Sequence, residues 1–123
     1  MLKYHPQHCW VETEARPAAV GLSAFALEKL GEIIYIDLPQ KGDRLRQGQE
    51  FGELESAKTT AELIAPLSGL VKAVNLELED NLEPLNASPQ DRGWLCRIEP
   101  DQDGELEGLL TEADYLALAG QEE

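Results

Sequence analysis

One candidate for covalent chemistry is Lys58, at the centre of residues 51–66. Small or apolar residues alternate with charged or polar ones on both sides of it: Gly52 and Leu54 precede the lysine, and Ala61, Leu63 and Ala65 follow it. An alternation of period two is typical of β-strands, so the pattern predicts a hairpin with Lys58 at or next to its tip. The tip lacks the Asn-Gly or Asp-Gly pair that usually marks a two-residue turn. A lysine at the tip of a hairpin is either an ordinary solvated charge or the attachment site of a covalently bound group.

The other reactive side chains form no recognisable catalytic set. His5, His8 and Cys9 lie close together, but their spacing matches no closed zinc pattern and no fourth ligand is evident, so we predict no metal site. The two cysteines, Cys9 and Cys96, are too few for a disulfide scaffold. No catalytic triad or phosphate-binding loop is recognisable either. The sequence therefore predicts no active site of the protein's own.

The length and the net charge of the chain limit the number of domains and the kinds of partner that we expect. The 123 residues suit one domain with one hydrophobic core, so we predict a single domain over residues 1–123. The formal net charge is −14, from 24 acidic and 10 basic residues. This charge disfavours binding to nucleic acid or to an anionic membrane, and it favours partners with basic docking surfaces. No apolar stretch suits a signal peptide or a membrane span, which predicts a soluble, cytoplasmic protein.

The elements that position Lys58 are predicted to be mostly β-strands. Besides the hairpin, strands are expected at residues 8–14, 18–22, 32–38, 70–76 and 94–98. Two short helices are expected: an early one over residues 24–30, capped by Ser23 and ended by Gly31, and a C-terminal one capped by Thr111 that reaches Gly120. Residues 75–93 are rich in Glu, Asn and Pro and are predicted to be a surface excursion, and residues 121–123 are predicted to fray.

The strands that flank the hairpin resemble each other. The first copy contains Gly31, Ile33, Ile36, Leu38, Asp43 and Leu45, and at a nearly constant separation the second contains Gly69, Val71, Val74, Leu76, Asp80 and Leu82. Lys58 falls between the two copies. Two similar strand units related by a pseudo-twofold axis indicate two small sheets closed on each other, with the hairpin between them.

The segment Glu55-Ser56-Ala57-Lys58, taken with Gly69, resembles a lipoyl domain and, more narrowly, the H protein family of the glycine cleavage system. Similar residues extend over almost the whole chain, at Trp10-Val11, 20–23, 30–33, Leu38-Pro39, Gly42-Asp43, 50–52, 78–81 and 93–95. A lone Glu-Ser-x-Lys would be a weak signal, but Gly69 at its fixed distance and these flanks make it specific. The resemblance implies a mostly β barrel-sandwich hybrid with two short helices, one early and one C-terminal.

The resemblance also implies a covalent cofactor. Lys58 would carry lipoic acid in an amide bond, and Glu55 and Gly69 would be recognised by the lipoylating enzyme, a lipoate-protein ligase or a lipoyl transferase. The arm would shuttle an aminomethyl group between glycine decarboxylase, aminomethyltransferase and dihydrolipoyl dehydrogenase, and the cofactor would hold the chemistry while the protein supplies position. Biotin carriers, which are related, have Met on both sides of the lysine, so Ala57 and Thr59 disfavour biotin here.

Cys9 and Thr59 depart from the usual residues of this family and leave alternatives open. The family usually has Glu at the position of Cys9, where a carboxylate could hold the cationic aminomethyl group by a charge-assisted hydrogen bond. One alternative is a lipoate-binding carrier of sulfur oxidation that works with a heterodisulfide-reductase-like complex, and another is a relay that passes lipoate between enzymes. The sulfur alternative suggests the hypothesis that Cys9 and Cys96 approach each other or the arm. The competing interpretation is that both are small buried hydrophobic residues.

Overall fold

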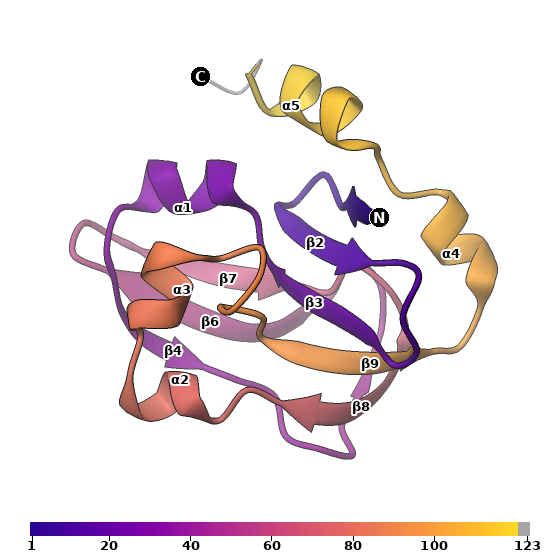
Figure 1. The fold of residues 1–123 in the computed structure, drawn as a ribbon, viewed down its shortest axis with the longest axis horizontal. Coiled ribbons are helices and arrows are strands. Elements are labelled where there is room, and N and C mark those ends of the chain that lie inside the picture. The colour runs from indigo at the N-terminus through magenta and orange to yellow at the C-terminus, as the bar shows by residue number, and fades with distance from the viewer. Residues whose placement is uncertain (121–123) are drawn as a thin grey trace.

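The computed structural model describes residues 1–120, so the predicted fraying of residues 121–123 lies outside the described part of the chain. The strands form two antiparallel sheets (Figure 1). One sheet has the order β1-β2-β3-β9-β8-β5 and the other the order β4-β6-β7. The bounds are β1 Leu2–Tyr4, β2 Cys9–Glu12, β3 Ala18–Leu22, β4 Ile33–Asp37, β5 Arg44–Leu45, β6 Glu50–Ser56, β7 Thr60–Ile64, β8 Gly69–Val74 and β9 Cys96–Pro100. The predicted mostly β architecture is confirmed.

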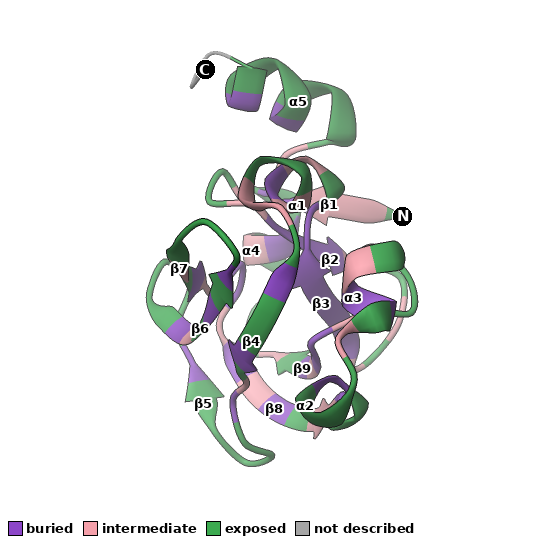
Figure 2. Cartoon of the chain, turned by 90° about the vertical axis from the view of Figure 1, so that its left-hand side faces the viewer, coloured by how far each residue is buried: buried purple, intermediate pink, exposed green. Residues whose placement is uncertain are grey.

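The two sheets bury their apolar faces in a common core. In the three-stranded sheet, alternation puts Leu54 and Leu63 in the core and leaves Glu53 and Glu62 exposed. Val71 of the six-stranded sheet belongs to the same hydrophobic cluster. Figure 2 shows this contrast, with buried residues along the strands and an exposed loop between β6 and β7. Because each buried aliphatic side chain contributes about 1.5–3 kcal/mol, the hydrophobic effect holds the sheets together.

Residues 1–120 contain five short helices, where the sequence predicts two. The predicted early and C-terminal helices are α1 Ala24–Leu30 and α5 Glu112–Gly120. The additional helices are α2 Glu77–Asp80, α3 Glu83–Ala87 and α4 Asp103–Glu107. Each of these three is little more than one turn, which is too short to display the 3.6-residue periodicity that identifies a helix in a sequence. None of the helices in this part of the chain is long and apolar enough to cross a membrane.

Part of the segment 75–93 is buried, so its prediction as a surface excursion is wrong. Leu78 on α2 is 1% exposed and Leu85 on α3 is 0% exposed. Asn86 fastens the segment to β4, because its Oδ1 accepts a hydrogen bond from the Ile33 N–H (2.8 Å) and its Nδ2 donates to the Ile33 carbonyl (3.1 Å). The two leucines therefore complete the core beside β4, although most of their neighbours in the sequence are polar.

The predicted helix caps are confirmed. The Oγ of Ser23 accepts a hydrogen bond from the Ala26 N–H (3.1 Å) at the start of α1. Gly31 ends α1 with a φ of 83°, in the left-handed region that favours glycine. Thr111 accepts a hydrogen bond from the Asp114 N–H (3.2 Å) at the start of α5. Strand ends are less accurate: β9 is shifted two residues from the predicted 94–98, and the very short β1 and β5 are not predicted.

Candidate functional site

Lys58 lies at the tip of the β6–β7 hairpin, as the alternation predicts. Residues 57–59 connect Ser56, which ends β6, to Thr60, which begins β7. The Ser56 hydroxyl takes the place of the missing turn motif: Oγ accepts hydrogen bonds from the Lys58 N–H (3.2 Å) and the Thr59 N–H (3.1 Å) and donates to the Thr59 carbonyl (3.2 Å). Because Ser56 is 4% exposed, water competes little for these bonds, and the lysine backbone is held in one place.

The hairpin tip is also fastened to the end of α1. The Ala57 N–H donates a hydrogen bond to the Glu32 carbonyl (3.1 Å). The Lys58 side chain then lies over Gly31, since a Cβ placed on this glycine would be 3.6 Å from Lys58 Cε and 4.0 Å from Nζ. Lys58 is exposed and makes no ion pair with any residue in the range 1–120. The Lys58 backbone is therefore held in place, and its amine is accessible to a modifying enzyme.

The outer face of the three-stranded sheet is acidic next to Lys58. Glu55, a predicted recognition residue, is exposed and pairs with the exposed Tyr35 of β4. One pair further along, Glu53 lies opposite both Asp37 and Glu62, so three exposed carboxylates form a row across the sheet. Like charges directly opposite one another destabilise a sheet. The row therefore costs stability in the isolated protein and gives this face a negative potential.

Gly69, the other predicted recognition residue, lies in the other sheet from Lys58. It begins β8 and pairs with Leu45 and Pro100. A Cβ at this position would overlap the Glu99 carbonyl oxygen and would lie 2.6 Å from Ile98 Cγ2. The structure therefore gives Gly69 a role in the close packing of β8 on β9. Its recognition by a lipoylating enzyme stays a prediction.

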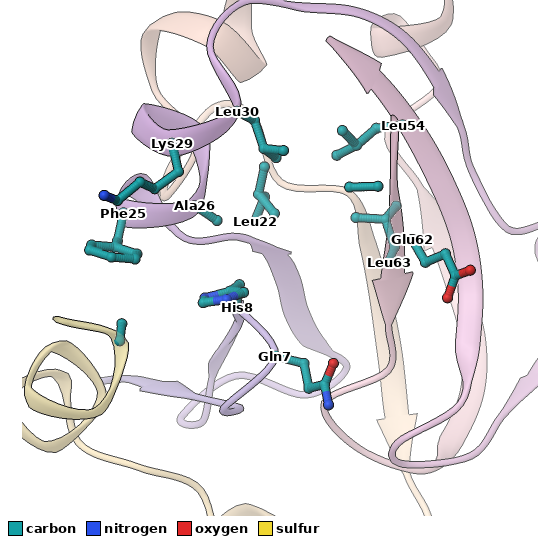
Figure 3. Close-up of a pocket in the computed structure, with 12 residues that line it drawn as sticks. Gln7, His8, Leu22, Phe25, Ala26, Lys29, Leu30, Leu54, Glu62 and Leu63 are labelled. Atoms are coloured by element: carbon teal, nitrogen blue, oxygen red, sulfur yellow. The ribbon is translucent and has the colours of Figure 1, made fainter. Parts of the chain in front are cut away.

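A cavity of about 280 Å³ opens beside the hairpin (Figure 3). Its polar lining residues are Gln7, His8, Lys29 and Glu62, and its apolar ones are Leu22, Phe25, Ala26, Leu30, Leu54, Ala61, Leu63 and Ala119. Figure 3 shows the lining of α1 and the lining of the hairpin strands facing each other across the space. Leu30, which lines the cavity, immediately precedes Gly31, over which Lys58 lies, whereas Lys58 itself does not line the cavity.

Cys9 and Cys96 lie in the core, and neither lines this cavity. Cys9 pairs with Leu22 and Cys96 with Val20, so the two thiols are two strands apart and offset along the sheet. Sheet spacings put their Cα atoms roughly 12 Å apart, beyond the ~7 Å limit for a disulfide. Burial raises the pKa of Cys9 to about 12 and raises that of Cys96 as well. This geometry disfavours a reactive thiol pair and favours two small buried hydrophobic residues.

The sequence does not identify Ser56 or the cavity walls as part of the site. A signal for Ser56 exists, because serine side chains often bond the backbone two or three residues further on in turns. The cavity has no such local signal, since His8, Phe25 and Glu62 come together only through tertiary packing. Within residues 1–120, no three His, Cys, Asp or Glu side chains are grouped closely enough to hold a metal ion.

Comparison with known proteins finds matches over nearly the whole chain. The family model described as Glycine cleavage H-protein matches residues 2–122. Two proteins named Glycine cleavage system H protein, from two strains of Staphylococcus epidermidis, are 42% and 41% identical over 119 residues, which is 97% of this chain and 94% of each relative. The crystal structure of a glycine cleavage system H protein from Mycobacterium marinum matches with a TM-score of 0.86 and 33% identity, over 97% of this chain and 96% of that chain.

Proposed function

Because the chain belongs to the glycine cleavage H-protein family, we propose that Lys58 carries a lipoyl group in amide linkage and that this arm carries an aminomethyl group between the enzymes of glycine cleavage. The setting of Lys58 supports the proposal most directly. Acylation removes the charge of a lysine, so an attachment site should not hold the fold together through an ion pair. Lys58 meets this requirement, because it makes no ion pair within residues 1–120 and its backbone is held by Ser56.

The residues around Lys58 fit a lipoyl group. The dithiolane ring and its aliphatic chain are apolar, and the adjacent cavity is walled mainly by residues such as Leu30, Leu54 and Leu63. When bound, the lipoyl group supplies a disulfide that can be reduced to two thiols and can hold a cargo. The chain itself supplies position: Ser56 holds the hairpin tip, Gly31 leaves room for the lysine stem, and the cavity offers apolar walls.

The residues around the cavity bear on the choice between the two proposed cargoes. A carboxylate is missing at residue 9, and the Cys9 side chain lies in the core away from the cavity. Glu62 borders the cavity, but it is exposed opposite Glu53 on the outer face of the sheet, and Figure 3 shows its carboxylate directed away from the cavity. The sulfur-oxidation alternative draws on Cys9 and Cys96, and the burial of both cysteines counts against it.

The acidic outer face of the three-stranded sheet, which lies next to Lys58, also indicates how the proposed partners would bind. A lipoate-protein ligase or lipoyl transferase would recognise Glu55, which lies close to Lys58. Glycine decarboxylase, aminomethyltransferase and dihydrolipoyl dehydrogenase would each approach the acidic face of the three-stranded sheet with a basic surface. In this scheme the chain is a carrier and a substrate of its partners, and its two free cysteines suit the reducing cytoplasm.

Intact-mass spectrometry tests the attachment. After co-expression with a lipoate-protein ligase, the native chain is expected to gain one lipoyl adduct and Lys58→Arg to gain none. Lys41→Arg is the matched control, because Lys41 is also an exposed lysine in a turn, and this variant is expected to behave like the native chain. A native chain that stays unmodified under these conditions would contradict the proposal.

Loading of the modified protein separates the two metabolic roles. Incubation with glycine and a glycine decarboxylase is expected to release carbon dioxide and to open the lipoyl disulfide, so that one sulfur gains an aminomethyl group, the other gains a hydrogen, and the chain gains the mass of both. Efficient turnover of the arm by a heterodisulfide-reductase-like complex, without any loading from glycine, would favour the sulfur-oxidation alternative.

A further inference from the structure

Residues 31–33, where α1 ends and β4 begins, support the tip of the hairpin that carries Lys58. The Lys58 side chain lies over Gly31, since a Cβ on this glycine would be 3.6 Å from Lys58 Cε. The Glu32 carbonyl accepts a hydrogen bond from the Ala57 N–H (3.1 Å), which fastens the tip to this segment. The position of Lys58 therefore depends on how firmly residues 31–33 are themselves held.

The pairing of β4 with β6 does not extend regularly to this segment. The sheet has the order β4-β6-β7, so β4 is an edge strand with one side unpaired by any strand. The register of β4 on β6 shifts between Ile33 and Tyr35. An irregularity of this kind locally disrupts the hydrogen bonds between two strands. At this end of β4, strand pairing alone therefore holds the backbone of Ile33 less firmly than it holds the rest of the strand.

The side chain of Asn86, on α3, holds the Ile33 backbone in place of a neighbouring strand (Figure 1). Its Oδ1 accepts a hydrogen bond from the Ile33 N–H (2.8 Å), and its Nδ2 donates to the Ile33 carbonyl (3.1 Å). A side-chain amide has both a donor and an acceptor, so it can pair with a backbone as a peptide unit does. Nδ2 also donates to the Leu82 carbonyl (3.3 Å), which orients the amide. Because Ile33 is 2% exposed, water competes little for its two bonds.

We propose that Asn86 is a positioning residue for Lys58. It acts through the backbone of residues 31–33, because it anchors Ile33 and so holds the Glu32 carbonyl that binds the hairpin tip. The part of Asn86 in lipoylation rests on the proposed function, whereas its hold on the tip does not. The polar segment 75–93 thereby contributes to the site as well as to the core.

The first test measures how firmly the tip is held in the protein without a lipoyl group. The Ala57 amide exchanges its hydrogen with solvent when its bond to the Glu32 carbonyl opens, and NMR follows this exchange at single residues. In Asn86→Ala the Ala57 amide is expected to exchange roughly tenfold faster than in the native chain, because two hydrogen bonds to the supporting segment are lost. The Ala65 amide, which bonds the Gln49 carbonyl (2.8 Å) at the other end of the hairpin, is expected to keep its native rate.

Asn75→Ala is the matched control. Asn75 belongs to the same segment 75–93, and its Nδ2 also donates to two backbone carbonyls, those of Arg92 (3.2 Å) and Trp94 (2.9 Å). This variant loses a similar set of hydrogen bonds away from residues 31–33, so it should leave the exchange rate of the Ala57 amide unchanged. A native Ala57 rate in folded Asn86→Ala would overturn the proposal. So would an equal acceleration in the two variants.

Asn86→Asp gives the answer where Asn86→Ala does not fold. An ionised carboxylate can still accept a hydrogen bond from the Ile33 N–H, but it has no proton to donate to the Ile33 carbonyl. The Ala57 amide is therefore expected to exchange faster than in the native chain in this variant as well. An Ala57 amide that exchanges at the native rate in folded Asn86→Asp would count against the proposal in the same way.

The second test measures how well Lys58 is presented to a lipoate-protein ligase. Each folded variant competes with the native chain in one reaction, and mass spectrometry separates the two chains by mass. Asn86→Ala is expected to be lipoylated roughly threefold more slowly than the native chain, because its lysine is less well placed, and Asn75→Ala at the native rate. Equal rates would overturn the role of Asn86 in presenting Lys58. A native chain without a lipoyl adduct would overturn the proposed function, and the exchange of the Ala57 amide would still decide whether Asn86 holds the tip.

Discussion

The side chain of Lys58 rests on Gly31, at the point where α1 ends. A Cβ on Gly31 would lie 3.6 Å from Lys58 Cε, and the glycine has a φ of 83°. One residue therefore meets two requirements, because the left-handed backbone ends the helix and the absent side chain leaves a bare surface for the lysine stem. The end of α1 and the position of the Lys58 amine are coupled through this contact.

We expect Gly31→Leu to slow lipoylation of Lys58. A Cβ alone would make an ordinary contact with the stem, but the further carbons of leucine need the space that the stem occupies. The positive φ should also lower the free energy of unfolding by about 1–2 kcal/mol. Urea unfolding gives the stability, and mass spectrometry during a ligase reaction gives the rate.

Gly48→Leu is the control for Gly31→Leu. Gly48 has a φ of 87°, and nothing lies within 4 Å of a Cβ placed on it. This variant should therefore carry the same backbone strain and lose similar stability, but it should be lipoylated at the native rate. Equal lipoylation rates in the two variants would show that contact with Gly31 does not position Lys58.

Ser56→Ala should loosen the hairpin tip. The substitution removes the three hydrogen bonds that Ser56 Oγ makes with the backbone of Lys58 and Thr59. Because Ser56 is buried, the expected loss in the free energy of unfolding is about 1–3 kcal/mol, together with slower lipoylation. Ser68→Ala is a matched control, since Ser68 Oγ bonds the Gln47 N–H and Glu105 away from the tip. A Ser56→Ala chain lipoylated as fast as Ser68→Ala would contradict this role.

The parts of the site that could be predicted from the sequence depend on local signals. The β6–β7 hairpin was predictable because alternation over several residues has one structural solution, a pair of half-buried strands. The ends of α1 were predictable because Ser23 and Gly31 are the residue types that cap helices. Both features rest on bonds between residues close in the chain, so their patterns can be read without knowledge of the fold.

The features that were missed depend on distant contacts. Segment 75–93 is polar in composition, and only the packing of Leu78 and Leu85 against the core shows that it is structural. The cavity is built from α1, the turn before β2 and the hairpin, whose proximity no local pattern encodes. Asn86 holds the backbone of Ile33, which lies 53 residues away, and an exposed asparagine would look the same in the sequence.

Gly69→Ala should destabilise the protein without impairing recognition of Lys58. The added Cβ would overlap the Glu99 carbonyl oxygen and crowd Ile98, so β8 and β9 must separate or the new residue must shift. We expect the free energy of unfolding to fall by about 1–3 kcal/mol, the usual cost of overpacking. Lipoylation measured well below the unfolding temperature should proceed at the native rate. A slow reaction in a fully folded Gly69→Ala chain would instead support direct recognition of Gly69 by the ligase.

The two buried thiols predict a loss of stability at alkaline pH. Burial raises the pKa of Cys9 from an ordinary value of 9.0 to about 12, and the pKa of Cys96 is raised for the same reason. Above pH 9 the unfolded chain releases thiol protons that the folded chain retains. The free energy of unfolding should therefore fall as pH rises, by up to about 1.4 kcal/mol per pH unit for each thiol. Below pH 9 both states keep these protons, so the thiols add no slope there.

Cys9→Ala tests this linkage when urea unfolding is measured between pH 8 and 10.5. The variant should be less stable than the native chain at pH 8, because a buried side chain has been shortened, but its stability should fall less steeply above pH 9. Val11→Ala is the control, since Val11 is equally buried on the same face of β2 and does not titrate. It should lose stability at all pH values and keep the native slope. A Cys9→Ala slope as steep as that of Val11→Ala would mean that the Cys9 thiol loses its proton as readily in the folded chain as in the unfolded one.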